Sequence, residues 1–518
     1  MILTIKVGTE ERKAVLEGPV LLSSALAQAG YPMNLPCAGS GRCGKCKVYA
    51  QGCLSPLSAE EEKLLTEDEI RNHCRLACQT MLTGDAAVTL IQRSEMAEIQ
   101  TEAVSRNYQR DQADGYSVAV DIGTTTVAAV AVDLSSGREL ASACAQNPQE
   151  KYGADVISRM ERSLAGDRQA LADCIQNCVN SLLEELSEKS GVSGTDFQRI
   201  VITGNTTMLF LLTNQDVDCL SHAPFEATDL FGREAPELSF PAAPGASCYL
   251  TRCNSAFVGG DITTAVLASG IAEDNRTSLL IDVGTNGEIV LAHQGKLSCS
   301  STAAGPALEG AGIYMGMPAM GGAISRVFLQ DGKIETETVG NLPDTGICGS
   351  GVIDAMAVLL KTGAVEETGL LLEEDHDFTD RICEAGTTLA FRIGEKTLFT
   401  QKDIRAVQLA KAAICAGIRT LLHEAGLKPS DVERFVIAGG FGSHIQVDNA
   451  AAIGLFPPEL AGKAEVLGNA ALEGAAMLLQ NRSFYESSYE LAAQMETVDL
   501  SSNPYFSDQY MDSMIFEV

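Results

Sequence analysis

Two segments of the chain share one pattern of apolar and polar positions. Residues 117–140 and 278–297 each begin with a short apolar strand that ends in Asp-x-Gly-Thr. A polar turn, a second apolar strand and a closing turn with glycine follow in both copies. Helical patterns come after each copy, at 169–190 and 350–361. Because only two copies exist, the pattern predicts a duplicated α/β domain rather than a solenoid.

The N-terminal part of the chain has a different pattern. Short strands are expected in ILTIKV, KAVLEG and AAVTLI, with helices at about 21–30 and 58–70. Residues 93–116 are polar and poorly periodic, as a linker is. We therefore expect a small β-rich domain, a linker and a large domain made of two halves and a tail, with the boundaries 1–92, 93–116, 117–277, 278–480 and 481–518. The tail is rich in aromatic residues, so we expect it to pack on the large domain.

Composition narrows the class of protein. The 518 residues are 45% hydrophobic, with no basic leader followed by an apolar stretch and no apolar run long enough to span a membrane. Beyond residue 78 the remaining cysteines of the 16 are scattered singly, which indicates reduced thiols of a cytoplasmic protein. The net charge of −31 argues against nucleic acid or an anionic membrane as a partner.

Four cysteines near the N-terminus carry the first chemical signal. Three lie in the run CAGSGRCGKC and the fourth in RLACQT: Cys37, Cys43, Cys46 and Cys78. The spacing resembles the C-x4-C-x2-C pattern with a distant fourth cysteine of plant-type ferredoxins, and the five-residue first gap resembles their adrenodoxin-like branch. Glycines at 39, 41 and 44 allow the sharp turns of a loop around a cluster. The resemblance implies a β-grasp ferredoxin domain with a 2Fe–2S cluster.

Two other interpretations of this region are weaker. Residues 39–45 match a P-loop, but Cys46 stands where that motif needs a Ser or Thr. A structural zinc site would use two close cysteine pairs, and it leaves Cys37 and the glycines without a role. Cys53 and Cys74 are expected to be spectators, with Cys74 the alternative fourth ligand.

The two Asp-x-Gly-Thr turns suit a nucleotide triphosphate. An aspartate at the end of a buried strand can hold a hydrated Mg²⁺, and backbone N–H and hydroxyl groups can cradle phosphate oxygens. A second such loop would clamp the phosphates from the opposite side. We expect Asp121 and Asp282 to be the catalytic carboxylates. The first loop supplies Gly123, Thr124, Thr125 and Thr126, and the second supplies Gly284, Thr285 and Asn286.

Residues 117–480 resemble the superfamily of acetate and sugar kinases, heat-shock ATPases and actin. Its phosphate loops, connecting segments and adenosine loop match, in the superfamily's order, 121–126, 203–206, 282–288, 438–442 and 468–471. The resemblance implies a duplicated actin-like (ribonuclease H-like) ATPase domain. It adds to the expected ATP contacts Gly204, Asn205, Gly439, Gly440 and Phe441.

A 2Fe–2S domain joined to this ATPase fold resembles the reductive activators of corrinoid proteins. Local phrases at 147–160, 303–313 and 344–356 fit that family, although longer members carry an extra domain where this chain has a short linker. The resemblance implies ATP-dependent transfer of one electron from the cluster to a Co(II) corrinoid on a methyl-carrier protein, which restores Co(I). It also implies an external low-potential electron donor.

A small-molecule kinase with a ferredoxin sensor domain is the alternative, since Asp282 could serve as general base toward a hydroxyl group. An ATP-driven chaperone would need a peptide-binding domain, and the sequence shows none. Glu309, in a glycine-rich stretch between the halves, either faces the partner or packs the cleft.

Overall fold

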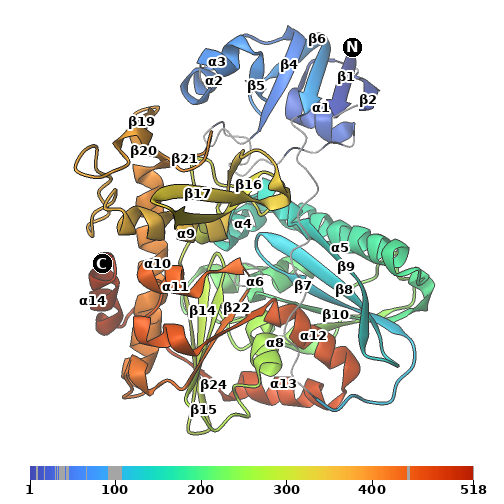
Figure 1. Cartoon of the computed structure of the whole chain (residues 1–518). Helices are drawn as coiled ribbons and strands as arrows, with labels where there is room; N and C mark the ends of the chain where they lie inside the picture. The colour runs from blue at the N-terminus through green and yellow to red at the C-terminus, as the bar shows by residue number, and fades with distance from the viewer. Residues whose placement is uncertain are drawn as a thin grey trace. The chain divides into compact units, whose positions relative to one another are not determined.

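The computed structural model describes residues 1–7, 10–16, 18–29, 31, 33, 41, 46–65, 67–90, 108–439 and 444–516. The chain divides into two compact units (Figure 1). One consists of Met1–Ser94 with Pro148–Cys174, and the other of Glu95–Asn147 with Ile175–Val518. Most of the predicted linker, 93–107, lies outside the described residues. None of the described helices is long and apolar enough to cross a membrane.

The N-terminal sheet has the β-grasp arrangement that the sequence predicts. Its strand order is β2-β1-β6-β4-β5, with β3 beside β6; β1 and β6 run parallel, and the other pairs are antiparallel. The strands are β1 Ile2–Val7, β2 Glu10–Val15, β3 Val20–Leu21, β4 Lys47–Leu54, β5 Cys74–Leu76 and β6 Met81–Leu90. The helices are α1 Leu22–Gln28, α2 Ala59–Leu64 and α3 Glu67–Arg71.

Two details of this domain differ from the prediction. The single helix expected at 58–70 is two short helices, because Leu65 after α2 has an extended backbone with φ −100° and ψ 138°. The strand expected at KAVLEG lies earlier, in β2, and β4 was not predicted. Lys47–Leu54 has only a weak alternation of burial, since polar Gln51 and Gly52 interrupt it.

A buried ion pair holds α2 against β5. Glu61 is fully buried, and its carboxylate accepts hydrogen bonds from Arg75 Nε at 2.9 Å and Arg75 Nη2 at 3.0 Å. The backbone N–H groups of Ser58 and Leu76 donate to the same carboxylate. Burial by itself raises the pKa of Glu61, but these donors outweigh it and hold the pKa below its ordinary value of 4.5.

Replacing Arg75 with methionine should destabilise the N-terminal domain by about 3–5 kcal/mol, because it leaves a buried carboxylate without its charged partner. Denaturant unfolding followed by far-UV circular dichroism measures the loss. Since the folded-state pKa of Glu61 is lowered, its contribution is present above the unfolded pKa and is lost as the pH falls below about 4.5. Lys6→Met, which breaks the exposed pair with Glu11, is the control and should cost under about 1 kcal/mol. Equal losses in both variants would contradict the assignment.

The larger unit contains two six-stranded sheets that share the order of five strands, which confirms the duplication. In each, an antiparallel meander of three strands is extended beyond its first strand by two parallel strands. The sixth strand differs: β11 is antiparallel to β12 in the first sheet, and β24 is parallel to β15 in the second. The first sheet runs β11-β12-β10-β7-β8-β9 and the second β23-β22-β13-β14-β15-β24. The first has β7 Tyr116–Ile122, β8 Thr126–Asp133, β9 Arg138–Gln146, β10 Phe197–Gly204, β11 Phe231–Glu234 and β12 Ser247–Arg252. The second has β13 Ser278–Val283, β14 Gly287–His293, β15 Lys296–Thr302, β22 Arg434–Ala438, β23 Ala464–Gly468 and β24 Met495–Thr497.

Helices α8 (Gly260–Ser269) and α12 (Ala470–Gln480) lie between these sheets, because one hydrophobic cluster joins both helices to strands of both sheets (Figure 1). The helices approach closely at Gly474, where a Cβ would lie 2.0 Å from the carbonyl oxygen of Thr264. The other helices are α4 Val156–Arg162, α5 Arg168–Ser190, α6 Thr206–Leu212, α7 Asp218–Ser221, α9 Gly349–Lys361, α10 Gln401–Glu424 and α11 Val447–Ala452. Two small sheets comprise β16 Ala323–Gln330, β17 Lys333–Thr338 and β18 Gly346–Ile347, and β19 Ile382–Ala385, β20 Thr388–Arg392 and β21 Leu398–Thr400.

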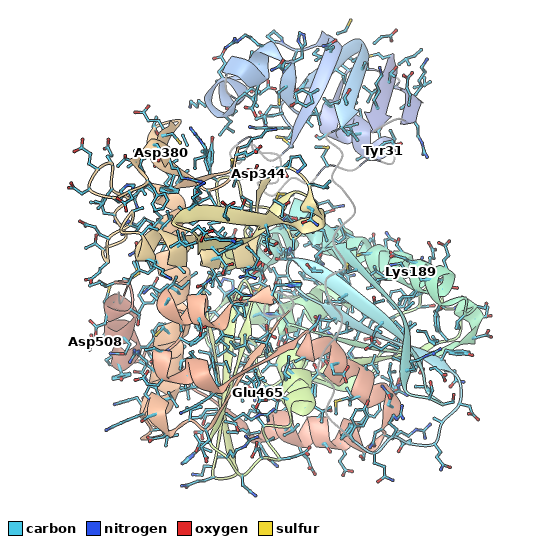
Figure 2. All side chains as sticks on the ribbon, viewed as in Figure 1. Tyr31, Lys189, Asp344, Asp380, Glu465 and Asp508 are labelled. Atoms are coloured by element: carbon cyan, nitrogen blue, oxygen red, sulfur yellow. The ribbon has the colours of Figure 1, made fainter. Side chains whose placement is uncertain are left out.

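The C-terminal tail packs on the large unit, as its aromatic residues predict. It contains α13 (Ser483–Gln494) and α14 (Pro504–Asp512), and β24 pairs in parallel with β15. Phe516 is fully buried in the core of the second half. Charged side chains, by contrast, stand on the outside, among them Lys189, Glu465 and Asp508 (Figure 2).

Candidate functional site

Both predicted catalytic aspartates are the penultimate residue of the first strand of their half. Asp121 of β7 pairs with Thr203 of the parallel strand β10. Asp282 of β13 pairs with Ala438 of the parallel strand β22. The carboxyl ends of parallel strands are where α/β sheets bind their ligands. The duplication therefore places two equivalent carboxylates where a nucleotide site is expected.

The loops after the aspartates are tight turns of the same kind. Gly123 N–H donates to Thr126 O at 2.9 Å, and Gly284 N–H donates to Asn286 O at 3.0 Å. A Cβ on Gly123 would lie 2.8 Å from Thr126 O, so this turn needs a residue without a side chain. Thr124, Thr126 and Asn286 are half-buried in these turns, whereas Thr285 is buried.

Glu309 joins the two loops. Its Oε2 accepts the hydroxyl proton of Thr125 at 2.6 Å and that of Thr285 at 3.0 Å. A Cβ on Gly284 would lie 3.3 Å from its other oxygen, Oε1. The structure therefore makes Glu309 a direct contact of both predicted phosphate loops.

Four carboxyl groups around these loops have raised pKa values. Burial is the largest cause for each, and neighbouring negative charges add to it for Asp282, Asp261 and Glu288. The pKa of Asp121 rises to about 6, that of Asp282 to about 7 with Asp121 and Glu309 nearby, and that of Asp261 to about 8 with Asp121 and Asp282 nearby. The pKa of Glu288, beside Asp261 and Asp282, also lies well above its ordinary range.

Sequence reasoning missed Asp261, Glu288 and the contact of Asn469. Asp261 follows two glycines at the start of α8, and that position was the available signal. Asn469 caps α12 by accepting from Leu472 N–H, and its Nδ2 donates to Asp121 Oδ2 at 2.9 Å. This amide opposes the effect of burial on the pKa of Asp121. The sequence places Asn469 in a connecting segment but predicts no contact for it.

The structure describes three of the five remaining predicted ATP contacts: Gly204, Asn205 and Gly439. Asn205 caps α6, where its Oδ1 accepts from Thr207 N–H at 2.9 Å, and a Cβ on Gly204 would lie 2.7 Å from Ile122 O. Gly439 has φ +101°, and a Cβ there would lie 2.7 Å from Asp282 Oδ1, so the adenosine-type loop passes directly beside the second aspartate. Gly440 and Phe441 lie outside the described residues.

Two of the four predicted cluster ligands are described, and they lie together. The Sγ atoms of Cys46 and Cys78 are 3.2 Å apart, and Gln79 Nε2 lies 3.5 Å from Cys78 Sγ. Contact with Cys46 is the main reason that the pKa of Cys78 falls to about 6. Cys37 and Cys43 lie outside the described residues. A pair of buried thiols at the edge of the glycine-rich segment fits a thiolate-held cluster.

The competing cysteines have different surroundings. Cys74 is buried in β5, where burial raises the pKa of its thiol to about 11, and Cys53 is exposed on β4. Neither suits thiolate ligation as Cys78 does. Within the described part of the chain, no group of three or more His, Cys, Asp or Glu side chains is arranged to hold a metal ion directly.

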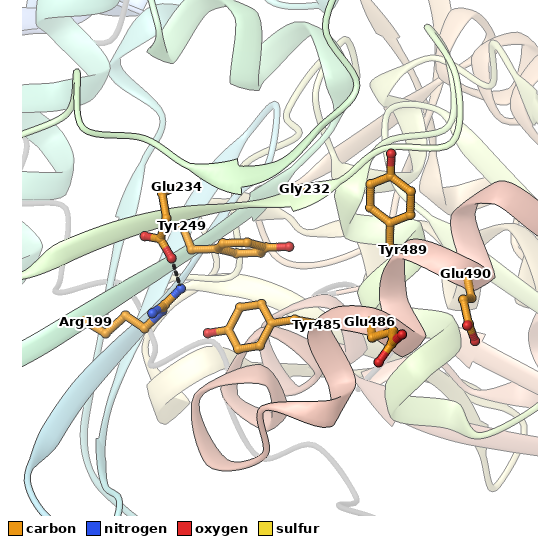
Figure 3. Close-up of a pocket in the computed structure, with 8 residues that line it drawn as sticks. All are labelled: Arg199, Gly232, Glu234, Tyr249, Tyr485, Glu486, Tyr489 and Glu490. Carbon is orange, nitrogen blue, oxygen red and sulfur yellow. Dashed lines mark hydrogen bonds and ion pairs between the residues drawn. The ribbon is translucent and has the colours of Figure 1, made fainter.

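A hollow of about 610 Å³ lies away from these loops, between α13 and the sheet edge of β10, β11 and β12 (Figure 3). Arg199 stands at the start of β10, the opposite end from Gly204. Its guanidinium lies over the rings of Tyr249 and Tyr485, 5.5 and 4.9 Å from their centroids, and pairs with Glu234. These contacts attach α13 to the sheet, so we assign the hollow a packing role.

Three family models match consecutive parts of the chain. A 2Fe-2S iron-sulfur cluster binding domain matches residues 5–83. The RACo middle region matches 116–274, and the C-terminal domain of RACo, the ASKHA domain, matches 276–518.

Known proteins are similar over most of the chain. Corrinoid activation enzyme RamQ of Eubacterium limosum is 31% identical over 96% of both chains. The [Co(II) methylated amine-specific corrinoid protein] reductase of Methanosarcina barkeri is 24% identical over 76% of both. A solved structure titled "Reductive activator for corrinoid,iron-sulfur protein" superposes with a TM-score of 0.74 and 27% identity, covering 99% of this chain and 98% of that one.

Proposed function

This chain belongs to the family of reductive activators of corrinoid proteins, and from that premise we propose that it reactivates a methyl-carrier protein. In the proposed reaction, one electron passes from the 2Fe–2S cluster to a Co(II) corrinoid and restores Co(I), with ATP supplying the driving force. One observation carries the proposal: a ferredoxin-type cysteine pair and a duplicated phosphate-loop site occur together in a single chain. Its similarity to named corrinoid activators, over 96% and 76% of the chain, supports the choice of substrate.

The residues of the nucleotide site have separable tasks in this proposal. Gly123 and Gly284 keep the backbone of the two turns open toward the phosphates, and the hydroxyl groups of Thr124, Thr125 and Thr285 donate to phosphate oxygens. Asp282 orients the attacking water, and Asn469 holds Asp121 in place. Gly439 lets the adenosine loop approach Asp282.

The carboxylate cluster fits a hydrated Mg²⁺. Buried carboxylates whose charges raise a neighbour's pKa favour a cation between them. Among the described residues, however, these carboxylates do not come close enough together to hold a metal ion by side chains alone. Mg²⁺ commonly keeps several waters and binds proteins through one or two carboxylates. When bound, it would neutralise phosphate charge, with Asp121 and Asp282 as its protein-side contacts.

ATP hydrolysis is coupled to electron transfer because the transfer from an ordinary 2Fe–2S cluster to the Co(II) corrinoid is thermodynamically unfavourable. For one electron, each 59 mV of unfavourable potential lowers the equilibrium yield about tenfold. ATP hydrolysis can exceed such a gap, either directly or by driving the complex apart after transfer. We propose that an external low-potential donor reduces the cluster, held by Cys37, Cys43, Cys46 and Cys78. We place the reaction in the cytoplasm, since none of the described cysteines forms a disulfide.

One experiment separates this function from a small-molecule kinase. We expect the reduced protein to convert a Co(II) corrinoid protein to Co(I), seen by its absorption spectrum, only when ATP is present. ATP hydrolysis should rise with the Co(II) corrinoid protein and stay at its basal rate with sugars, acetate or other small hydroxyl or carboxyl compounds. Phosphorylation of a small compound without any spectral change of the corrinoid would contradict the proposal and favour the kinase.

A further inference from the structure

The hydroxyl groups of Thr125 and Thr285 have one proton each to donate, and Glu309 Oε2 accepts both at 2.6 and 3.0 Å. The same two hydroxyls come from the loops that are expected to hold phosphate. A hydroxyl whose proton points at Glu309 cannot at the same time donate to a phosphate oxygen. Carboxylate and phosphate are therefore alternative acceptors for the same two protons.

The backbone holds Glu309 in this position. It ends the one-turn helix Pro306–Glu309, which lies between two glycines in the left-handed region, Gly305 at φ +76° and Gly310 at φ +80°. A Cβ on Gly310 would lie 2.9 Å from Met317 O, so this corner admits only a glycine. The backbone that carries Glu309 is thus constrained, and the side chain reaches both hydroxyl groups from it.

The bridge also connects the two halves of the duplicated domain. Thr125 belongs to the first half and Thr285 to the second, and 184 residues separate Thr125 from Glu309 in the chain. Four described acidic groups lie around the same loops: Asp121, Asp261, Asp282 and Glu288. Glu309 thus adds one more negative charge at the point where the triphosphate is expected.

We propose that Glu309 is a positioning residue that competes with the phosphates of ATP for the hydroxyl protons of Thr125 and Thr285. The inference rests on the proposed nucleotide site and adds a control of its affinity. When ATP binds, both hydroxyl groups have to turn their hydrogen bonds from the carboxylate to phosphate oxygens, and the repulsion between the two anions has to be overcome. Glu309 accordingly weakens nucleotide binding, and it ties the loops together whenever phosphate does not hold them.

The test is ATP binding by the full chain, measured by calorimetry with the Glu309→Gln and Glu309→Ala variants. The amide in Glu309→Gln keeps an oxygen that accepts both hydroxyls but lacks the charge, so this variant should bind ATP about tenfold more tightly than the wild type. Glu309→Ala also frees both hydroxyls and should bind at least as tightly as Glu309→Gln. In a Thr125→Val/Thr285→Val background this additional gain should vanish, because no hydroxyl remains to be released.

Weaker ATP binding by the Glu309 variants than by the wild type would overturn the inference. A residue that merely stabilises the loops predicts weaker ATP binding and a lower melting temperature in both variants. Glu496→Gln, an exposed carboxylate on β24, is the control for net charge and should leave the affinity unchanged. If the wild-type protein itself binds no ATP, the proposed function fails; if the wild type binds and Glu309→Gln binds equally or more weakly, this inference alone fails.

Discussion

The Cys78→Ser variant should lose the 2Fe–2S cluster and with it all reactivation of the Co(II) corrinoid protein. Thiolates hold every corner of such a cluster, and Cys78 Sγ lies 3.2 Å from Cys46 Sγ, the other described ligand candidate. Cys46→Ser should behave in the same way. Iron and sulfide analysis, expected at two each per chain in the wild type, and the visible spectrum measure the loss. ATP hydrolysis without the corrinoid protein should remain, because the nucleotide site uses other residues.

Cys74→Ser is the matched control, since Cys74 is a buried cysteine of the same domain. It lies in β5, and the pKa of its thiol rises to about 11, so it stays a neutral thiol at physiological pH. This variant should keep the wild-type iron content and spectrum. Cluster loss in Cys74→Ser with retention in Cys78→Ser would exchange the two residues in the ligand set. A colourless wild-type protein that carries zinc would contradict the cluster assignment altogether.

The duplicated domain was predictable because its periodicity is local. Two apolar hairpins with Asp-x-Gly-Thr turns define the first two strands of each half, and the structure has them as β7–β8 and β13–β14. The break after α2 and the strand β4 were not predictable in this way. Leu65 leaves the helical region although the residues before it are good helix formers. Strand β4 gains its stability from pairing with β6 and β5, which are distant in the sequence.

The residues of the candidate site also fall into those that a local sequence pattern predicts and those that only the folded structure reveals. The loop residues follow from a motif, because their roles depend on backbone turns that neighbouring residues encode. Asp261 and Glu309 come from segments whose own sequences show only a glycine-rich stretch with an acid, and their position becomes visible when α8 and the turn Pro306–Glu309 meet the phosphate loops in space. A carboxylate in a glycine-rich turn next to a phosphate loop is therefore a signal of a loop contact that sequence reasoning can use.

Asp282→Asn should lower ATP hydrolysis by about 10²–10³-fold while leaving the cluster spectrum unchanged. The substitution keeps the shape of the side chain and removes the charge that orients water, an effect worth several kcal/mol in comparable sites. Asp121→Asn should give a loss of the same order, since each aspartate is the penultimate residue of the equivalent strand of its half. Phosphate release measures the rate, and corrinoid reactivation by the reduced protein should fall in parallel if hydrolysis drives the transfer.

The same substitution should not destabilise the fold, and this outcome separates a functional carboxylate from a structural one. Burial, with the negative charges of Asp121 and Glu309 added to it, raises the pKa of Asp282 to about 7, so removing its charge lowers the cost of burial and relieves repulsion. The melting temperature of Asp282→Asn should therefore equal or exceed that of the wild type. Asp133→Asn, at the end of β8 and away from the loops, is the control and should hydrolyse ATP normally. Normal hydrolysis by both Asp282→Asn and Asp121→Asn would show that the nucleotide site lies elsewhere, and a lower melting temperature would make Asp282 a structural residue.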